Sequence, residues 1–229
     1  MTDSQPHRLA VLISGSGTNL QAILDAIEAG QLKARICAVL SNRADAGGLT
    51  RAKQAGIPTL TLDHRQFEDR ESFDQAMVDA LEPYQPDTVV LAGFMRILSP
   101  VFVAYYAGRL INIHPSLLPK YRGLNTHARA LEAGDERHGC SIHFVTEELD
   151  GGPLIAQASV TINANDTADS LSKRVQLCEH QLYPMVLQWR AQQRLVLTDN
   201  GVTLDGKPLP AQGYQSSQAN PGGRFAGGR

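Results

Sequence analysis

The chain has 229 residues, of which 42% are hydrophobic and 19% charged, and its formal net charge is −2. These values are typical of a globular domain, and they exclude the clustered basic excess of proteins that bind nucleic acid or anionic membranes. No run of about 18 apolar residues predicts a membrane span, and the amino terminus lacks the order of a signal peptide. Three widely spaced cysteines indicate reduced thiols, so we expect a cytoplasmic protein with small-molecule partners.

Strand-like apolar runs alternate with helical patterns through the first half of the chain. Strands are predicted at 8–14, 36–40, 58–62 and 88–91, and helices at 19–29, 45–55 and 71–81. This alternation predicts a Rossmann-like, doubly wound α/β fold, a mostly parallel sheet with helices on both faces. Ligands of such sheets bind at the carboxyl ends of the strands.

The second half continues the sheet less regularly. Strands are predicted at 110–113 and 142–145, separated by a long polar loop at 120–137, and connections of that length often act as lids. A helix is predicted at 166–191, and a terminal hairpin at 195–204 around Asp199-Asn200-Gly201. We expect a single domain at 1–214 and a disordered tail at 215–229, where Ser, Gln, Gly, Asn and Arg dominate.

The first candidate binding site is Ser14-Gly15-Ser16-Gly17-Thr18-Asn19, between the first predicted strand and helix. Glycines let a backbone approach a phosphate closely, and the free N–H groups at a helix N-terminus favour an anion. The segment is not a dinucleotide fingerprint, since Leu20 replaces the third glycine, and no Gly-Lys-Ser/Thr of a Walker site follows. It predicts a site for one phosphomonoester, with a turn that only joins strand to helix as the alternative.

Candidate catalytic residues stand at the end of a later strand. Asn112 and His114 are two residues apart, so their side chains share one face and point into one crevice. A carboxamide beside an imidazole could donate hydrogen bonds to an oxyanion and exchange protons near neutral pH. Asp150, in a turn with two glycines, is expected to bond the His114 ring and raise its pKa. Taken alone, this histidine and this turn could equally be structural.

Other chemistries are not favoured by the pattern. Ser116 and Cys140 lie outside any recognised nucleophile elbow, so a hydrolase triad is not predicted. His127, His138 and His143 lack the spacing of zinc ligands, and we expect no metal.

In combination, the motifs resemble the folate-dependent formyltransferases. The resemblance runs from Arg8 to about Tyr214. Besides the glycine-rich turn and the Asp150 turn, two further motifs carry it: Ala92-Gly93-Phe94-Met95-Arg96-Ile97-Leu98 and Asn112-Ile113-His114-Pro115-Ser116-Leu117-Leu118-Pro119. It implies transfer of the formyl group of 10-formyltetrahydrofolate to the primary amine of 5-phosphoribosylglycinamide, a step of purine synthesis. The amine would attack directly and give a tetrahedral intermediate.

The resemblance also implies roles for individual residues. The catalytic residues would be Asn112, His114 and Asp150. The phosphorylated substrate would contact Gly17, Thr18, Asn19, Gln176 and Glu179. The folate would lie against Arg70, Met95, Arg96, Ile97, Leu98 and Asn112, with Thr146, Glu147, Glu148, Leu149 and Asp150 closing over its pterin.

This chain departs from the family pattern in the mobile stretch at 120–127. Several relatives carry Pro at the position of Arg122 and His at the position of Asn125, so we assign the stretch no catalytic duty. Three alternatives remain open. A methionyl-tRNA formyltransferase would add a nucleic-acid-binding domain, a formyltetrahydrofolate hydrolase would use water in place of the amine, and a non-catalytic phosphosugar-binding protein could use the same sheet. We expect a monomer or a weak homodimer.

Overall fold

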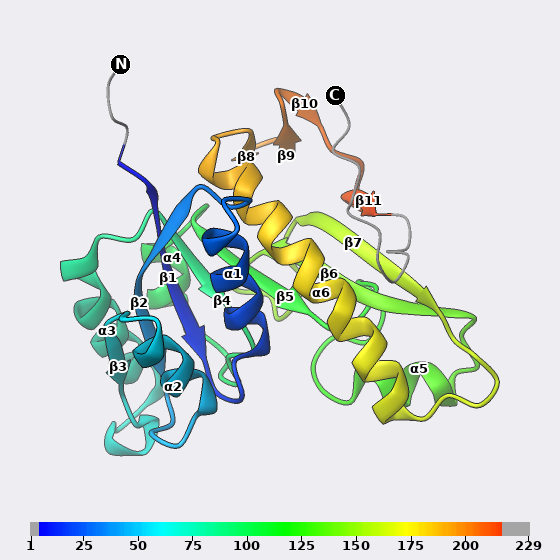
Figure 1. The fold of residues 1–229 in the computed structure, drawn as a ribbon, viewed down its shortest axis with the longest axis horizontal. Coiled ribbons are helices and arrows are strands. Elements are labelled where there is room, and N and C mark those ends of the chain that lie inside the picture. Colours follow the sequence, from blue (N-terminus) through cyan, green and yellow to red (C-terminus); the bar gives the residue numbers. More distant parts are fainter. Residues whose placement is uncertain (1–4, 217–229) are drawn as a thin grey trace.

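The apolar runs of the first half form parallel strands, as expected for strands that are covered on both faces. The computed structural model describes residues 5–216 and contains one eight-stranded sheet with the order β11-β7-β6-β5-β4-β1-β2-β3 (Figure 1). Its parallel centre consists of β1 (His7–Ile13), β2 (Ala34–Ser41), β3 (Thr59–Thr61), β4 (Thr88–Leu91) and β5 (Leu110–His114).

The helices divide between the two faces of the sheet according to the alternation of side chains along β1. Leu9, Val11 and Ile13 belong to a core with α1 (Thr18–Glu28), α2 (Gly47–Gln54) and the long α6 (Ala168–Ala191). Ala10 and Leu12 belong to a second core with α3 (Arg70–Leu81) and α4 (Pro100–Tyr105). Two 3-10 turns, η1 (His64–Gln66) and η2 (Glu82–Tyr84), flank α3. The predicted doubly wound, mostly parallel fold is confirmed.

The carboxyl-terminal half adds antiparallel strands to this sheet. β6 (Arg137–Phe144) pairs antiparallel with β5 and with β7 (Leu154–Thr161), and β11 (Tyr214–Ser216) runs parallel to β7. A separate small sheet holds β8 (Leu195–Thr198), β9 (Gly201–Leu204) and β10 (Lys207–Pro208), so the predicted terminal hairpin is confirmed.

Three elements of the structure were not predicted from the sequence. The predicted loop at 120–137 contains α5 (Thr126–Glu132), and Arg137 already begins β6. The helix escapes a periodicity search because it is one short, largely polar segment, in which Thr126 and Ala130 are the buried residues. Neither β7 nor α4 is predicted, although Ser99 followed by Pro100 is typical of a helix start.

The carboxyl-terminal boundary also differs. Gln215 and Ser216, which the composition assigns to the tail, lie in β11, and Ser216 is buried. The rest of the predicted tail, 217–229, lies outside the described residues. Within residues 5–216, we find no helix with the length and apolar character needed to cross a membrane.

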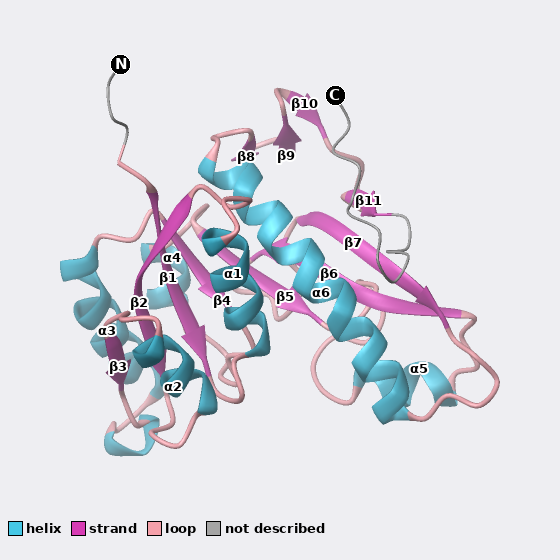
Figure 2. Cartoon of the chain, in the orientation of Figure 1, coloured by secondary structure: helices cyan, strands magenta, loops and turns pink. Residues whose placement is uncertain are grey.

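Because β1, β4 and β5 are parallel, the loops that follow them lie at one edge of the sheet (Figure 2). The first of these loops leads into α1, the second contains residues 92–99, and the third begins at Pro115. The fold therefore brings together three motifs, at 14–19, 92–98 and 112–119, the first and last of which begin about a hundred positions apart in the sequence.

Candidate active site

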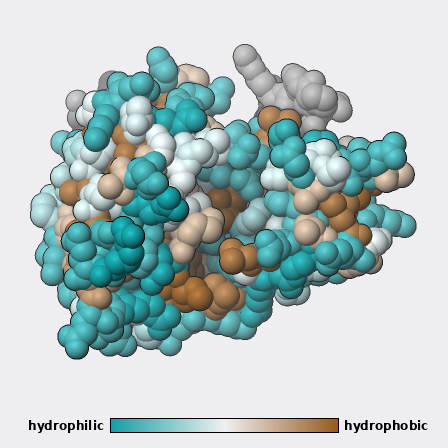
Figure 3. All heavy atoms as spheres, turned by 90° about the horizontal axis from the view of Figure 1, so that it is seen from below, coloured by the Kyte–Doolittle hydropathy of each residue, from teal (hydrophilic) through white to brown (hydrophobic). Residues whose placement is uncertain are grey.

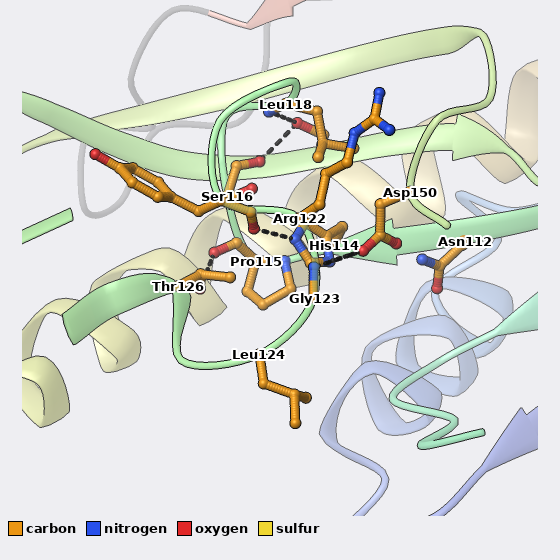
Figure 4. A network of polar contacts seen from close by, with 12 residues as sticks. Asn112, His114, Pro115, Ser116, Leu118, Arg122, Gly123, Leu124, Thr126 and Asp150 are labelled. Carbon is orange, nitrogen blue, oxygen red and sulfur yellow. Dashed lines mark hydrogen bonds and ion pairs between the residues drawn. The ribbon is translucent and has the colours of Figure 1, made fainter. Parts of the chain in front are cut away.

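Asn112 and His114 project from the same face of β5, as their spacing predicts. His114 is buried, with 6% of its surface exposed, and Asn112 is half-buried. Figure 4 shows both side chains on the side of the strand that faces Asp150. The Asp150 Oδ2 atom lies 3.5 Å from His114 Nδ1, so the predicted convergence of an amide, an imidazole and a carboxylate is present.

A turn between β6 and β7 places Asp150 in this position. Asp150 adopts a positive φ of 48°, which is unusual for a residue with a side chain. Position 152 requires a glycine, because a Cβ there would lie 1.8 Å from the Phe144 carbonyl oxygen. The turn therefore requires a glycine for its close backbone approach, and the Asp-Gly-Gly sequence has a geometric as well as a chemical reason.

A second imidazole ring, that of His143, belongs to the same cluster and was not predicted. Its Nε2 atom lies 3.2 Å from Asn112 Nδ2 and 3.7 Å from Asp150 Oδ1, and its Nδ1 atom lies 2.9 Å from the Phe144 carbonyl oxygen. These partners assign the proton to Nδ1, so that Nε2 accepts one N–H of Asn112. His143 thereby fixes the amide and leaves its second N–H free for a ligand.

The segment at 121–124 runs past His114 and Asp150 (Figure 4). The Tyr121 carbonyl oxygen lies 2.9 Å from His114 Nε2, and the Gly123 N–H donates to Asp150 Oδ2 over 2.9 Å. Arg122 donates to Glu148 on the turn that carries Asp150. The segment thus contacts both catalytic side chains through its backbone.

The electrostatics of the pair differ from the sequence-based expectation. Burial lowers the pKa of His114, and the Tyr121 carbonyl and the Asp150 carboxylate oppose this only in part. The expectation that Asp150 raises the pKa of His114 above its usual value is therefore wrong: the carboxylate acts in that direction, but loss of hydration outweighs it. Burial would raise the pKa of Asp150, yet the neighbouring His143 ring and the hydrogen bond from the Gly123 N–H hold it below its ordinary value.

The glycine-rich turn lies at the start of α1 and contacts α6. Gly17 is the N-cap residue, has a φ of 72°, and approaches α2 so closely that a Cβ would lie 2.6 Å from Gly48 Cα. Asn19 donates to Glu179 over 2.8 Å, and Gln176 donates to the Thr18 hydroxyl over 3.0 Å. The structure therefore brings together all five residues predicted to contact the phosphorylated substrate.

Two features of this anion-binding end were not predicted. Arg51 donates to the Ser16 carbonyl oxygen over 2.8 Å and so places a cation beside the turn. Burial raises the pKa of Glu179 to about 7, although the hydrogen bond from Asn19 opposes this shift. No periodicity in the sequence indicates that a carboxyl group on α6 is buried against α1.

The predicted folate residues divide into two groups. Met95 and Ile97 are 64% and 54% exposed on the turn after β4, whereas Leu98 packs into the core between α3 and α4 and supports the turn from below. On the Asp150 turn, Leu149 is 47% exposed. Figure 3, seen from below the view of Figure 1, shows a recess with hydrophobic atoms at its margin.

Arg70 stands apart from the other predicted folate residues in the chain. It is the first residue of α3 and is exposed, and within the described part of the chain no hydrogen bond or ion pair joins it to Asn112, His114 or Asp150. Both Arg70 and Arg96 nevertheless act electrostatically on Asp74, so the two guanidinium groups face a common neighbourhood. Among residues 5–216, no group of three or more potential ligands is arranged to hold a metal ion.

Comparison with known proteins gives concordant matches. The family model described as formyl transferase matches residues 7–187. Phosphoribosylglycinamide formyltransferase of Escherichia coli is 57% identical over 210 residues, which cover 92% of this chain and 99% of that protein. The enzyme of the same name from Haemophilus influenzae is 50% identical over 207 residues, covering 90% and 98%. A solved phosphoribosylglycinamide formyltransferase from Coxiella burnetii superposes with a TM-score of 0.89 at 54% identity, over 92% of this chain and 99% of that one.

Proposed function

This chain belongs to the formyl transferase family, and from that premise we propose that it transfers the formyl group of 10-formyltetrahydrofolate to the primary amine of 5-phosphoribosylglycinamide. The products are the formylated amide and tetrahydrofolate, and the reaction is a step of de novo purine biosynthesis. The observation that carries the proposal is the 3.5 Å approach of Asp150 to His114 Nδ1, beside Asn112 and at the edge of the sheet that holds the glycine-rich turn.

The phosphate of the substrate binds at the glycine-rich turn. The backbone N–H groups at the start of α1 carry partial positive charge and favour an anion. Thr18 and Asn19 are fixed by Gln176 and Glu179, so the turn is held rigidly against α6 before any ligand arrives. Glu179 is the group suited to the ribose hydroxyls, because a carboxyl group accepts hydrogen bonds from them.

The folate binds against Met95, Ile97 and Leu149, and Arg96 lies on the same turn. A pterin ring is flat and largely apolar on its faces, and exposed apolar side chains on two adjoining turns suit it. The remaining predicted residues of the Asp150 turn, Thr146, Glu147 and Glu148, supply polar groups for the edge of the ring.

The chemical step is a direct attack of the neutral amine on the formyl carbon. A carbon–nitrogen bond forms, and the formyl oxygen becomes an oxyanion. Asn112 donates its free N–H to that oxygen, and His114 donates its Nε2–H, which the Tyr121 carbonyl accepts in the structure. Collapse of the intermediate breaks the bond to the folate nitrogen.

One proton must pass from the attacking nitrogen to the departing folate nitrogen. We assign this transfer to a bridging water molecule, while His114 keeps its Nε2–H on the oxyanion. The ring is largely neutral beforehand because burial lowers its pKa. Once it takes up a proton, Nδ1–H faces the Asp150 carboxylate, which is ionised because its own pKa is low.

The test is an assay of the three-component mixture. Purified protein is incubated with 10-formyltetrahydrofolate, with and without 5-phosphoribosylglycinamide, and tetrahydrofolate release is followed. Release that depends on the amine supports the proposal. Release without the amine would indicate a hydrolase, and no release would indicate a phosphosugar-binding protein, so either result rejects it. Transfer RNA carrying methionine serves as the competing acceptor.

We also propose a cytoplasmic location and a monomer or weak homodimer. All three cysteines, Cys37, Cys140 and Cys178, are free thiols, which fits a reducing compartment. Sedimentation of the purified protein over a range of concentrations measures its oligomeric state.

A further inference from the structure

The turn between β4 and α4 has no regular secondary structure, although it presents two of the apolar side chains proposed to bind the folate. Met95 and Ile97 are both more than half exposed and cannot hold their own backbone in place. Precise ligand positions require support from surrounding groups. Contacts at each end of the turn supply this support.

Ser14 fixes the amino-terminal end of the turn. Its hydroxyl accepts the Met95 N–H over 2.8 Å and donates to Asn42 Oδ1 over 2.6 Å, while its own N–H donates to the Gly93 carbonyl oxygen over 3.1 Å. Ser14 is also the first residue of the glycine-rich motif. The anion-binding turn and the folate turn are thus joined by one buried side chain.

Asp74 fixes the carboxyl-terminal end. It lies on the inner face of α3, is fully buried, and accepts the Ser99 N–H over 2.5 Å through Oδ2. Ser99 is the residue before α4 begins and follows Leu98, the core residue under the turn. Among residues 5–216, no second hydrogen bond joins α3 to this turn.

Burying an aspartate at position 74 is energetically unfavourable. The surrounding core contains Phe73, Met77 and Phe102, and burial raises the pKa of Asp74 against the opposing effects of Ser99, Arg70 and Arg96. An apolar side chain would pack here without that cost. The carboxyl group supplies what an apolar side chain cannot, namely an acceptor for one particular backbone N–H of an irregular turn.

We propose that Asp74 is a positioning residue for the folate, acting through Ser99 to hold the turn that carries Met95 and Ile97. This inference rests on the proposed function and deepens it. Asp74 is not expected to touch either substrate. Its loss should therefore weaken folate binding and leave the phosphorylated substrate, which binds at the other end of the cleft, unaffected.

The test compares Asp74→Ala and Asp74→Asn with the matched control Asp79→Ala, which removes an exposed aspartate from the same helix. Calorimetry measures the Kd of tetrahydrofolate, kinetics give KM for each substrate, and melting temperature reports folding. We expect Asp74→Ala to raise the tetrahydrofolate Kd about 10-fold, as for loss of a hydrogen bond to a charged group, with the KM of the phosphorylated substrate unchanged. Asp74→Asn keeps the acceptor oxygen and should retain folate binding.

The inference fails if Asp74→Ala binds tetrahydrofolate like the wild type, if it weakens both substrates equally, or if Asp74→Asn is as defective as Asp74→Ala. Should Asp74→Ala not fold, Asp74→Glu replaces it, because the added methylene displaces the turn while keeping the acceptor. The wild type separates this inference from the proposed function: a wild type that neither binds tetrahydrofolate nor releases it from 10-formyltetrahydrofolate rejects the function itself.

Discussion

Two carboxyl groups, Glu179 beside the glycine-rich turn and Asp150 beside His114, have pKa values that are shifted in opposite directions. Glu179 on α6 has one hydrogen-bond donor, Asn19, and burial raises its pKa to about 7. At Asp150 the His143 ring, the Gly123 N–H and the His114 ring lie against the carboxylate, so its pKa falls below the ordinary value. Burial raises the pKa of both carboxyl groups, and the polar neighbours outweigh it only at Asp150.

This difference suits the two proposed tasks. A carboxyl group that binds ribose hydroxyls needs only hydrogen-bonding atoms and can carry a proton part of the time. A carboxylate that stabilises an imidazolium must be ionised throughout. Substitutions that neutralise each group without changing its shape test whether the two ends of the cleft are as distinct as their electrostatics indicate.

The largest effect is expected at the catalytic end. Asp150→Asn removes the charge opposite His114 Nδ1 and should lower kcat by about 100-fold, while His114→Ala, which removes an oxyanion donor, should lower it by about 100- to 1,000-fold. Both should leave the affinity for the phosphorylated substrate unchanged. Steady-state kinetics with each substrate varied measure this, and near-normal kcat in Asp150→Asn would contradict the proposed role of the charge.

The matched neutralisation at the other end is Glu179→Gln, and its main effect is on stability. The folded-state pKa of Glu179 is above its unfolded value of 4.5, so the stability it contributes is complete below 4.5 and is lost as pH rises to about 7. The variant cannot ionise and escapes that loss. Relative to the wild type it should gain up to about 3 kcal/mol of unfolding free energy above pH 7, and little near pH 5.

Urea denaturation of both proteins at pH 5 and pH 8 measures this gain, and taking the difference between them cancels the titration of all other groups. Asp169→Asn, which neutralises an exposed carboxylate at the start of the same helix, is the control and should show no comparable pH-dependent gain. An equal difference at the two pH values would mean that Glu179 does not carry its proton into the neutral range.

The same two ends differ in how far they could be predicted from the sequence. Gly17, Thr18 and Asn19 form a local strand-turn-helix junction, so residue order alone indicates an anion site. The shared face of Asn112 and His114 follows directly from the two-residue repeat of a strand. Sites built within one element, or across one junction, are visible to this kind of reasoning.

Contacts between distant elements were less accessible. The pairing of Asn112 with His143 depends on the antiparallel register of β5 and β6, which no local pattern specifies. A signal existed, since His143 is a polar residue between the apolar Ile142 and Phe144. Asp74 carries the same signal, as an acidic residue on the inner face of α3. The pKa of His114 was predicted in the wrong direction because burial, which dominates it, is a property of the folded chain.

His143 allows a smaller test of the catalytic end. His143→Phe keeps a ring in the buried strand and removes the acceptor that holds Asn112. Without that partner the amide can turn, and we expect kcat to fall about 10-fold, the value of one hydrogen bond. His7→Phe is the control and should keep kcat. His7 is the first residue of β1, so it lies at the opposite end of that strand from the glycine-rich turn. If both variants lose activity equally, the effect is one of folding and not of amide orientation.

The smallest effect is expected at Arg122, whose pair with Glu148 joins the outer segment to the Asp150 turn. Both side chains are well exposed, 40% and 64%, so water and salt screen the attraction and the pair contributes at most about 1 kcal/mol. Arg122→Ala should therefore change kcat/KM by less than about 5-fold at low salt, and the difference should vanish near 0.5 M salt. The control Arg194→Ala breaks an exposed pair in the small sheet and should have no effect. A larger change in kcat/KM that does not depend on salt would show that Arg122 contacts a substrate. The electrostatic difference between the Glu179 and Asp150 ends of the site would then extend to the segment at 121–124.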